Sequence, residues 1–133
     1  MIVHQTLLPP GWTRPKGYAN GVAARGQLVF TAGVVGWDEH ERFVAKDLAG
    51  QLRQVLLNTR AILAEAGAGP EHMARMTWYV TSRDEYLAQI AEIGEIYREV
   101  LGKNYPAMAV VEVTALVNAE AKVEIETIAV VPD

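Results

Sequence analysis

Several features are missing from this sequence, and each absence excludes a class of protein. There is no cysteine, which excludes disulfides, a thiolate nucleophile and a cysteine-based metal site. No basic run occurs and the net charge is −4, which argues against nucleic acid as the main partner. No stretch reaches the ~20 apolar residues of a membrane span, and the segment MIVHQTLLPPGWTRP lacks the basic and apolar regions of a signal peptide. We therefore expect a cytoplasmic protein with no membrane partner.

Internal repeats, low-complexity tracts and linkers are absent as well. The chain has 133 residues, of which 50% are hydrophobic and 21% are charged, an ordinary globular composition. The stretches 9–21 and 67–70 are rich in glycine and proline, but both are short enough to be loops inside one domain. Residues 1–133 are therefore expected to form a single domain with a substantial hydrophobic core.

Two segments have the period of an amphipathic helix. The first is expected between Asp47, a suitable N-cap, and Gly67, a suitable stop. Its apolar face carries Leu48, Leu52, Val55, Leu56, Ile62, Leu63 and Ala66, and its polar face largely Gln51, Arg53, Gln54, Asn58, Arg60 and Glu65. In the second, Ser82 and Glu85 fit a capping box and Gly102 fits the stop. Its stripe consists of Tyr86, Ile90, Ile93, Tyr97, Val100 and Leu101.

The other apolar runs are short and rich in β-branched or aromatic residues, which is typical of strands. They lie at 27–35, 73–81, 107–113 and 122–131, with a weaker pair near 2–6 and 18–22. The order is β-β-β-α-β-α-β-β, which predicts an α+β sandwich: a mixed six-stranded sheet with two helices packed on one face.

The last strand has apolar residues on both faces. In KVEIETIAVV, Val123 and Ile125 point one way, whereas Ile128 and Val130 point the other. Because the helices can cover only one face of the sheet, we expect the other face to pack against another subunit.

Several motifs together resemble one protein family. KGYANGV, LVFTAGVVG, QLRQVLLNTRAILAEAG, YPAMAVVEVTALV and AKVEIETIAVVP occur in the order and spacing of the Rid/YjgF (RidA-like, perchloric-acid-soluble-protein) family. The resemblance implies a chorismate-mutase-like α+β fold and a homotrimer whose sheets line a central barrel, with three clefts between subunits. It also implies hydrolysis of reactive enamines and imines to ketoacids and ammonia, with no metal or cofactor.

The residues that would bind a substrate depart from the family pattern. Met108 in YPAMAVVEV stands where deaminating members have an arginine that grips the substrate carboxylate. Ala32 replaces a serine, Val110 a cysteine and Gly94 an asparagine. Each change removes a polar group, so the resemblance implies an apolar ligand pocket formed by Met108, Ala32, Gly33, Ala107 and Val110.

Two residues of the family's catalytic site remain, Tyr18 in GYANGV and Glu124 in VEIE. The resemblance implies that Glu124 holds the water that attacks the imine carbon and that Tyr18 lines the cleft. A structural role for Glu124, as an ion-pair partner on a strand, fits the sequence equally well. Glu126 lies on the same face of the strand, a spacing that suits paired acid–base work but that strand alternation also produces.

Other candidate residues carry weaker signals. His4, His40 and His72 have no metal-ligand spacing. Trp12, Trp37 and Trp78 would either cage a ligand or pack in a core or interface. Arg14, Lys16 and Arg25 surround Tyr18 in the sequence, and either supply the positive charge that Met108 lacks or only solvate the surface.

Two functions from different classes therefore compete. The first is an enamine or imine deaminase whose specificity is altered by Met108. The second is a non-catalytic trimeric module that binds a small metabolite or a partner. A ribonuclease, an activity attributed to some relatives, ranks third because the chain is acidic and has no basic patch.

Overall fold

The computed structural model describes residues 3–133, which fold into one α+β domain built on a mixed sheet. The strands of this sheet are β3 (Gln27–Phe30), β4 (Val34–Val35), β5 (Met73–Val80), β6 (Ala107–Glu112) and β7 (Val123–Val131). Their order is β3-β7-β5-β6, and β4 also pairs with β7. Only β5 and β6 are parallel; the other pairs are antiparallel. The predicted α+β class with a mixed sheet is thereby confirmed, and the strands at 73–81, 107–113 and 122–131 are found within about one residue of their predicted ends.

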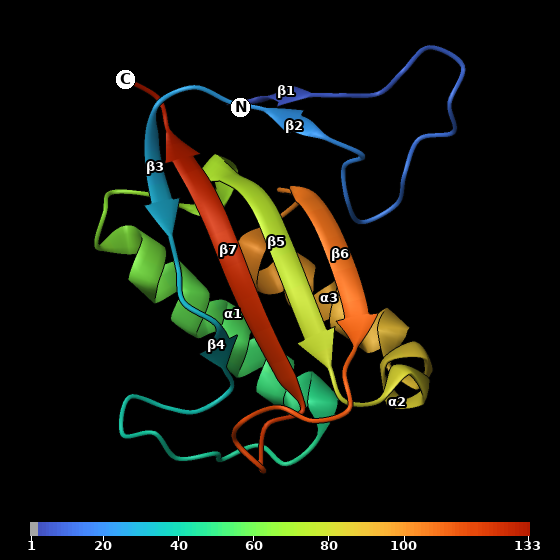
Figure 1. Ribbon diagram of the computed structural model, residues 1–133, viewed down its shortest axis with the longest axis vertical. Helices are drawn as coiled ribbons and strands as arrows, with labels where there is room; N and C mark the ends of the chain where they lie inside the picture. The colour runs from blue at the N-terminus through green and yellow to red at the C-terminus, as the bar shows by residue number, and fades with distance from the viewer. Residues whose placement is uncertain (1–2) are drawn as a thin grey trace.

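The helices lie on one face of this sheet, as predicted (Figure 1). They are α1 (Leu48–Ala64), α2 (Arg83–Ala88) and α3 (Ile90–Leu101), and a short 3₁₀ turn, η1 (Pro70–His72), precedes β5. α1 and α3 pack against each other and against β5 and β7, where their leucine, isoleucine and valine side chains form the main core. No helix formed by residues 3–133 combines the length and apolar character needed to cross a membrane.

The second predicted helix is in fact two helices. The chain breaks at Gln89, whose backbone has left helical geometry (φ −106°, ψ 12°). The Gln89 side chain instead accepts a hydrogen bond from the backbone N–H of Ala49 at 2.9 Å, in the first turn of α1. That bond satisfies a donor that a helix N-terminus leaves free. The predicted cap Asp47 stands at the N-cap position but makes no side-chain hydrogen bond there.

Two further predictions for α1 were wrong in detail. Gln51, assigned to the polar face, is buried and bonds to Ala45 O, Glu120 O and the backbone N–H of Lys122. Ile62, assigned to the apolar face, is exposed. A glutamine is buried without penalty when all its polar atoms have partners, and the loops that provide them are distant in the sequence.

The strand predicted at 27–35 is interrupted by a bulge. Between the pairs Phe30–Ile128 and Val34–Ile125, three residues (31–33) oppose two residues of β7 (126–127). Thr31 closes the gap, since its hydroxyl accepts a hydrogen bond from the backbone N–H of Thr127 at 3.0 Å. An extra residue reverses the alternation of faces. Phe30 and Val34 would share a face in a regular strand. Because of the bulge, Val34 points into the core, whereas Phe30 is exposed on the opposite face.

The two weak N-terminal strands do not extend the sheet, so the prediction of a six-stranded sheet was wrong. β1 (Gln5–Thr6) and β2 (Val22–Ala23) form a separate two-stranded ribbon (Figure 1). Within residues 3–133, one isolated β-bridge, between Ala19 and Ala107, joins this region to the edge strand β6. The predicted strand at 2–6 begins at Ile2, which lies outside the described residues.

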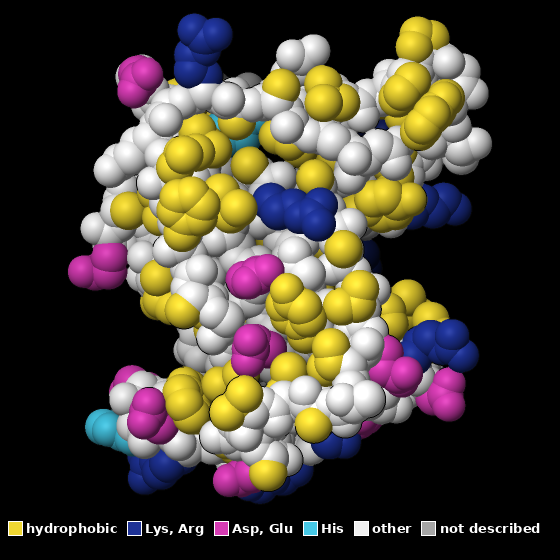
Figure 2. Space-filling view, in the orientation of Figure 1, with side chains coloured by type: hydrophobic (Ala, Val, Ile, Leu, Met, Phe, Trp, Pro, Cys, Tyr) yellow, Lys and Arg dark blue, Asp and Glu magenta, His cyan; other side chains and the backbone are white. Residues whose placement is uncertain are grey.

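The face of the sheet without helices is amphipathic. In β7, Val123, Ile125, Thr127 and Ala129 are buried, which confirms the predicted inward face. On the other face, Leu28 and Phe30 of β3 are 60% and 64% exposed. Figure 2 shows hydrophobic side chains spread over this face, with a few charged side chains among them. We refer to it below as the open face.

Candidate functional site

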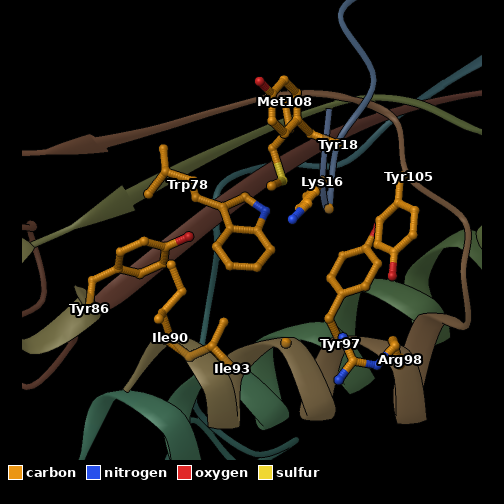
Figure 3. A pocket seen from close by; sticks show the side chains of 13 residues that line it. Lys16, Tyr18, Trp78, Tyr86, Ile90, Ile93, Tyr97, Arg98, Tyr105 and Met108 are labelled. Carbon is orange, nitrogen blue, oxygen red and sulfur yellow. The ribbon is translucent and has the colours of Figure 1, made fainter. Parts of the chain in front are cut away.

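A cavity of about 490 Å³ lies between the sheet and the helices at the edge strand β6. Side chains from β5, β6, α2 and α3 form its walls, and the loop that carries Lys16 and Tyr18 forms one side (Figure 3). The pairing of β5 with β6 explains why β6 contributes to it. Met108 pairs with Met76, and Val110 with Trp78, so each shares the helix-facing side of its buried partner.

The Lys16–Tyr18 loop is held against β6 by its backbone. The N–H of Ala19 donates to Pro106 O at 3.0 Å, beside the bridge to Ala107. Gly17 turns the chain with φ +79°, a conformation that glycine adopts without strain. Together these contacts bring Tyr18, a predicted catalytic residue, and Lys16 to the cavity.

Aromatic side chains dominate the cavity wall. Tyr97 stacks on Tyr105 with ring centroids 5.3 Å apart, and Trp78 lies 6.2 Å from Tyr97. Burial raises the pKa of the Tyr97 and Tyr86 hydroxyls, so both stay protonated at neutral pH. The lining contains no carboxylate and no histidine. One chain therefore offers a binding cavity here but no general base.

The charges around the cavity are positive. Lys16 and Arg98 both line it, and neither forms an ion pair with a carboxylate anywhere in residues 3–133. Arg98 lies along α3 over Gly94, where an added Cβ would come within 3.3 Å of its Nη1 atom. Gly94, where the family resemblance implied an asparagine, thus makes room for a guanidinium.

The cavity also contains an unpartnered donor. The Trp78 side chain is 2% exposed, and its indole N–H has no acceptor among residues 3–133. Figure 3 shows the indole nitrogen directed toward the Lys16 side of the cavity. Because buried donors are nearly always satisfied, this group marks a position suited to an acceptor.

Glu124, the second predicted catalytic residue, lies elsewhere, on the open face. Its partners across the strands are Val35 and Tyr79. Its carboxylate sits over Gly33, where a Cβ would come within 2.3 Å of Oε2, so the glycine provides space for the carboxylate. Within residues 3–133, Glu124 has no side-chain hydrogen bond and no ion pair.

Glu126, two residues away on the same face, is engaged instead. It accepts a hydrogen bond from the Tyr79 hydroxyl at 2.8 Å. That hydrogen bond raises the pKa of the Tyr79 hydroxyl above its usual value. Among residues 3–133, Glu124 has neither carboxylate oxygen bonded to a protein group, whereas one oxygen of Glu126 is bonded.

The residues predicted to form one pocket therefore fall into two groups. Met108, Val110 and Tyr18 line the cavity on the helix side. Ala32 and Gly33 lie in the bulge beside Glu124. Ala107, paired with the exposed Arg75, points toward the open face.

Part of the cavity wall was not anticipated as a site. Tyr86, Ile90, Ile93 and Tyr97 were assigned only to the core stripe of a helix. Their period is that of a buried face, and no local signal distinguishes a cavity wall from a core. Arg98 gave no signal either, and Lys16 was one of three candidate cations.

The remaining candidates do not converge. Trp12 is 62% exposed, Trp37 packs on Phe43, and only Trp78 reaches the cavity. The His4 ring contacts the backbone oxygen of His72 at 3.0 Å. In residues 3–133 there is no group of three metal-ligating side chains close enough to hold an ion.

Known proteins match this chain over most of its length. The family model described as Endoribonuclease L-PSP matches residues 13–131. A RutC family protein of Pyrococcus abyssi is 32% identical over 117 residues, covering 87% of this chain and 88% of the relative. TdcF of Escherichia coli, a candidate reactive intermediate deaminase by its name, is 31% identical over 129 residues, covering 95% of this chain and 94% of the relative.

Solved structures agree with the sequence matches. YyfB of Yersinia pestis, a Rid family protein of unknown function, superposes with a TM-score of 0.84 at 29% identity, covering 97% of this chain and 99% of that one. The structure of E. coli TdcF with bound serine gives a TM-score of 0.67 at 31% identity, covering 97% and 98%. By sequence and by fold, this chain belongs to the Rid/YjgF family, whose family model carries the L-PSP name.

Proposed function

We propose that this protein is an enamine or imine deaminase of altered specificity that works as a homotrimer. Water adds to the C=N carbon of the substrate, the C–N bond then breaks, and a ketone and ammonia leave. The step needs a carboxylate that activates water and a pocket that holds the substrate. Glu124 supplies the first and the cavity around Met108 the second.

The observation that carries this proposal is the free state of Glu124. A purely structural role as an ion-pair partner would need a cation beside it, and none lies within salt-bridge distance among residues 3–133. Its neighbour Glu126 on the same face, by contrast, accepts a hydrogen bond from the Tyr79 hydroxyl at 2.8 Å. Gly33 keeps the space around Glu124 open.

Assembly is part of the proposal because one chain separates the two groups. Glu124 projects from the open face, whereas Met108 faces the helices. The exposed Leu28 and Phe30 make the open face suitable for burial against a second copy. In this proposal the open face of a neighbouring copy, with its Glu124, meets the β6 edge of the first chain, where the cavity lies.

The altered specificity follows from the apolar wall. Methionine offers no donor and no charge to a carboxylate, and it adapts to irregular shapes. The relative TdcF binds serine in its crystal structure, which supports a small-molecule role for the pocket. Here Met108 and Val110 select for a larger ligand than a small amino acid.

The test is an assay of imine hydrolysis with purified protein. An amino acid oxidase generates the imine of a bulky amino acid in place, and ketoacid and ammonia release are followed with and without the protein. We expect acceleration with wild type and loss of it with Glu124→Gln.

A non-catalytic binding module is the second candidate. It is favoured by the cavity itself, which contains no carboxylate or histidine in one chain. Ligand binding with no acceleration of hydrolysis, in a protein shown to be trimeric, would select it. Ribonuclease activity remains third, since the chain's net charge of −4 repels a phosphate backbone.

A further inference from the structure

The cavity contains an anion anchor that Met108 does not provide. We propose that it binds carboxylates with an aromatic or bulky apolar body, and that Lys16 and the Trp78 indole N–H together hold the carboxylate. This inference deepens the proposed deaminase function. It rests on that function in one respect only: if the protein is a deaminase, its substrates are aromatic or bulky 2-imino acids.

The Trp78 indole N–H carries the first step. It is a buried donor with no protein acceptor in residues 3–133, and it is aimed into the cavity (Figure 3). The indole N–H can only donate a hydrogen bond, so its partner must be an acceptor with a lone pair. Among residues 3–133 no protein atom supplies one, and we assign this place to a ligand oxygen.

Lys16 defines the charge of that ligand. Its ammonium group lies on the side of the cavity toward which the indole nitrogen points (Figure 3). It has no carboxylate partner among residues 3–133, and no acidic residue lines the cavity. Because the Lys16 side chain is exposed, an anion beside it keeps part of its hydration, which lowers the cost of binding it next to an apolar wall.

The rest of the cavity defines the body of the ligand. Tyr86, Ile90 and Ile93 line it beyond Trp78, and Met108 forms the sheet side (Figure 3). A volume of about 490 Å³ is within the range of small-molecule pockets. A two-carbon side chain would leave most of it unfilled, whereas an aromatic ring would bury its surface against these side chains.

The binding test uses a stable probe series in calorimetry: 3-phenylpropionate, propionate and 3-phenylpropan-1-ol. We expect 3-phenylpropionate to bind about tenfold or more tightly than propionate, which lacks the ring. It should also bind about fivefold or more tightly than the neutral alcohol. Lys16→Met should weaken the binding of 3-phenylpropionate about fivefold. The matched control is Arg14→Met, at an exposed cation outside the cavity, which should change this affinity by less than about twofold.

Nuclear magnetic resonance tests the indole directly. The three tryptophan indole N–H resonances can be assigned from Trp12→Phe and Trp37→Phe, so the assignment survives if Trp78→Phe does not fold. We expect the Trp78 resonance to shift on addition of 3-phenylpropionate. An unmoved Trp78 resonance, equal affinity for propionate, or a loss of affinity in Arg98→Met but not in Lys16→Met would each overturn the proposed anchor.

Turnover distinguishes this inference from the function on which it builds. If 3-phenylpropionate binds as described but the imine of phenylalanine is hydrolysed no faster with the protein, the deaminase proposal fails and the anchor stands. If small and aromatic imines are hydrolysed equally well and Lys16→Met has no effect, the deaminase proposal stands and the anchor fails.

Discussion

The two faces of the sheet differ in what they offer to chemistry. The helix side provides an aromatic-lined cavity with Lys16 and Arg98 at its walls and no acid. The open face provides the free carboxylate of Glu124 and exposed apolar side chains. The strand residues of the cavity come from β5 and β6, whereas Glu124 and the exposed apolar residues come from β7 and β3. A reaction that needs a carboxylate and a pocket is therefore divided within one chain, and contact between copies is the simplest way to join the parts.

The largest expected effect comes from removing the apolar character of the open face. Leu28→Asp together with Phe30→Asp places two charges where we propose that copies meet, so the assembly should dissociate. Light scattering should change from three times the 14.6 kDa chain mass to one. As a control, Ile62→Asp on the exposed side of α1 should leave the mass unchanged. A wild-type protein that already runs as a monomer would end the proposal of an intersubunit cleft.

The next largest effect separates the two carboxylates. Glu124→Gln keeps the shape of the side chain but removes the base, and the rate of imine hydrolysis should fall about 100-fold or more. Glu126→Gln should cost far less, because Glu126 is engaged by Tyr79 rather than free. Steady-state assays on both variants provide the measurement. Equal losses in the two would mean that the carboxylates act as a pair or only support the sheet.

A smaller effect is expected from introducing an arginine into the cavity wall. Met108→Arg, alone or with Ala32→Ser, should raise hydrolysis of the small enamine 2-aminoacrylate by about tenfold. The wild type should be poor with it, since Met108 makes no charge-assisted contact. A dehydratase-coupled assay measures both. If the folded trimeric variant neither turns over the enamine nor binds small carboxylates, Glu124 and Tyr18 do not form a latent site, and the binding-module function takes precedence.

The smallest effect concerns the Tyr79–Glu126 hydrogen bond on the open face. The pKa of the Tyr79 hydroxyl is raised from 10.0 because the Glu126 carboxylate accepts a hydrogen bond from the protonated hydroxyl. A raised pKa means that the stabilisation is fully present below pH 10 and is lost as the pH rises through the folded-state value. The ultraviolet titration difference between wild type and Tyr79→Phe should show a midpoint above 10.0, and Glu126→Gln should lower that midpoint. An unchanged midpoint would mean that the hydrogen bond is absent in solution.

Much of the fold was predictable because its signals are local. The stripe from Tyr86 to Leu101 and the stop at Gly102 specify a helix without reference to the rest of the chain, and Gly102 indeed has φ +71°. The departures have a common cause. Gln89 breaks the second helix because it bonds to Ala49, and Gln51 is buried because distant loops satisfy its amide. Such partners lie 40 to 71 residues away in the sequence, where periodicity carries no information.

The candidate site shows the same limit. Its apolar wall could be expected from Met108 and Val110, and the structure places both at the cavity. The cations could not be ranked, since Arg14, Lys16 and Arg25 have the same local setting. Contacts distant in the sequence, the bridge between Ala19 and Ala107 and the hydrogen bond from Ala19 to Pro106, bring Lys16 to the cavity.

The sequence by itself determined the two helical segments, the alternation along β7, and the apolar character of Met108, Val110 and Ala32. Those properties depend on residue type and on neighbours a few positions away. The tertiary structure alone decided that, among residues 3–133, Glu124 has no bonded partner while Glu126 has one, and that the Trp78 indole N–H points into the cavity lined by Lys16 with no acceptor in that part of the chain. These outcomes depend on which segments the fold brings together, because a hydrogen bond or an ion pair forms only where two side chains meet in space.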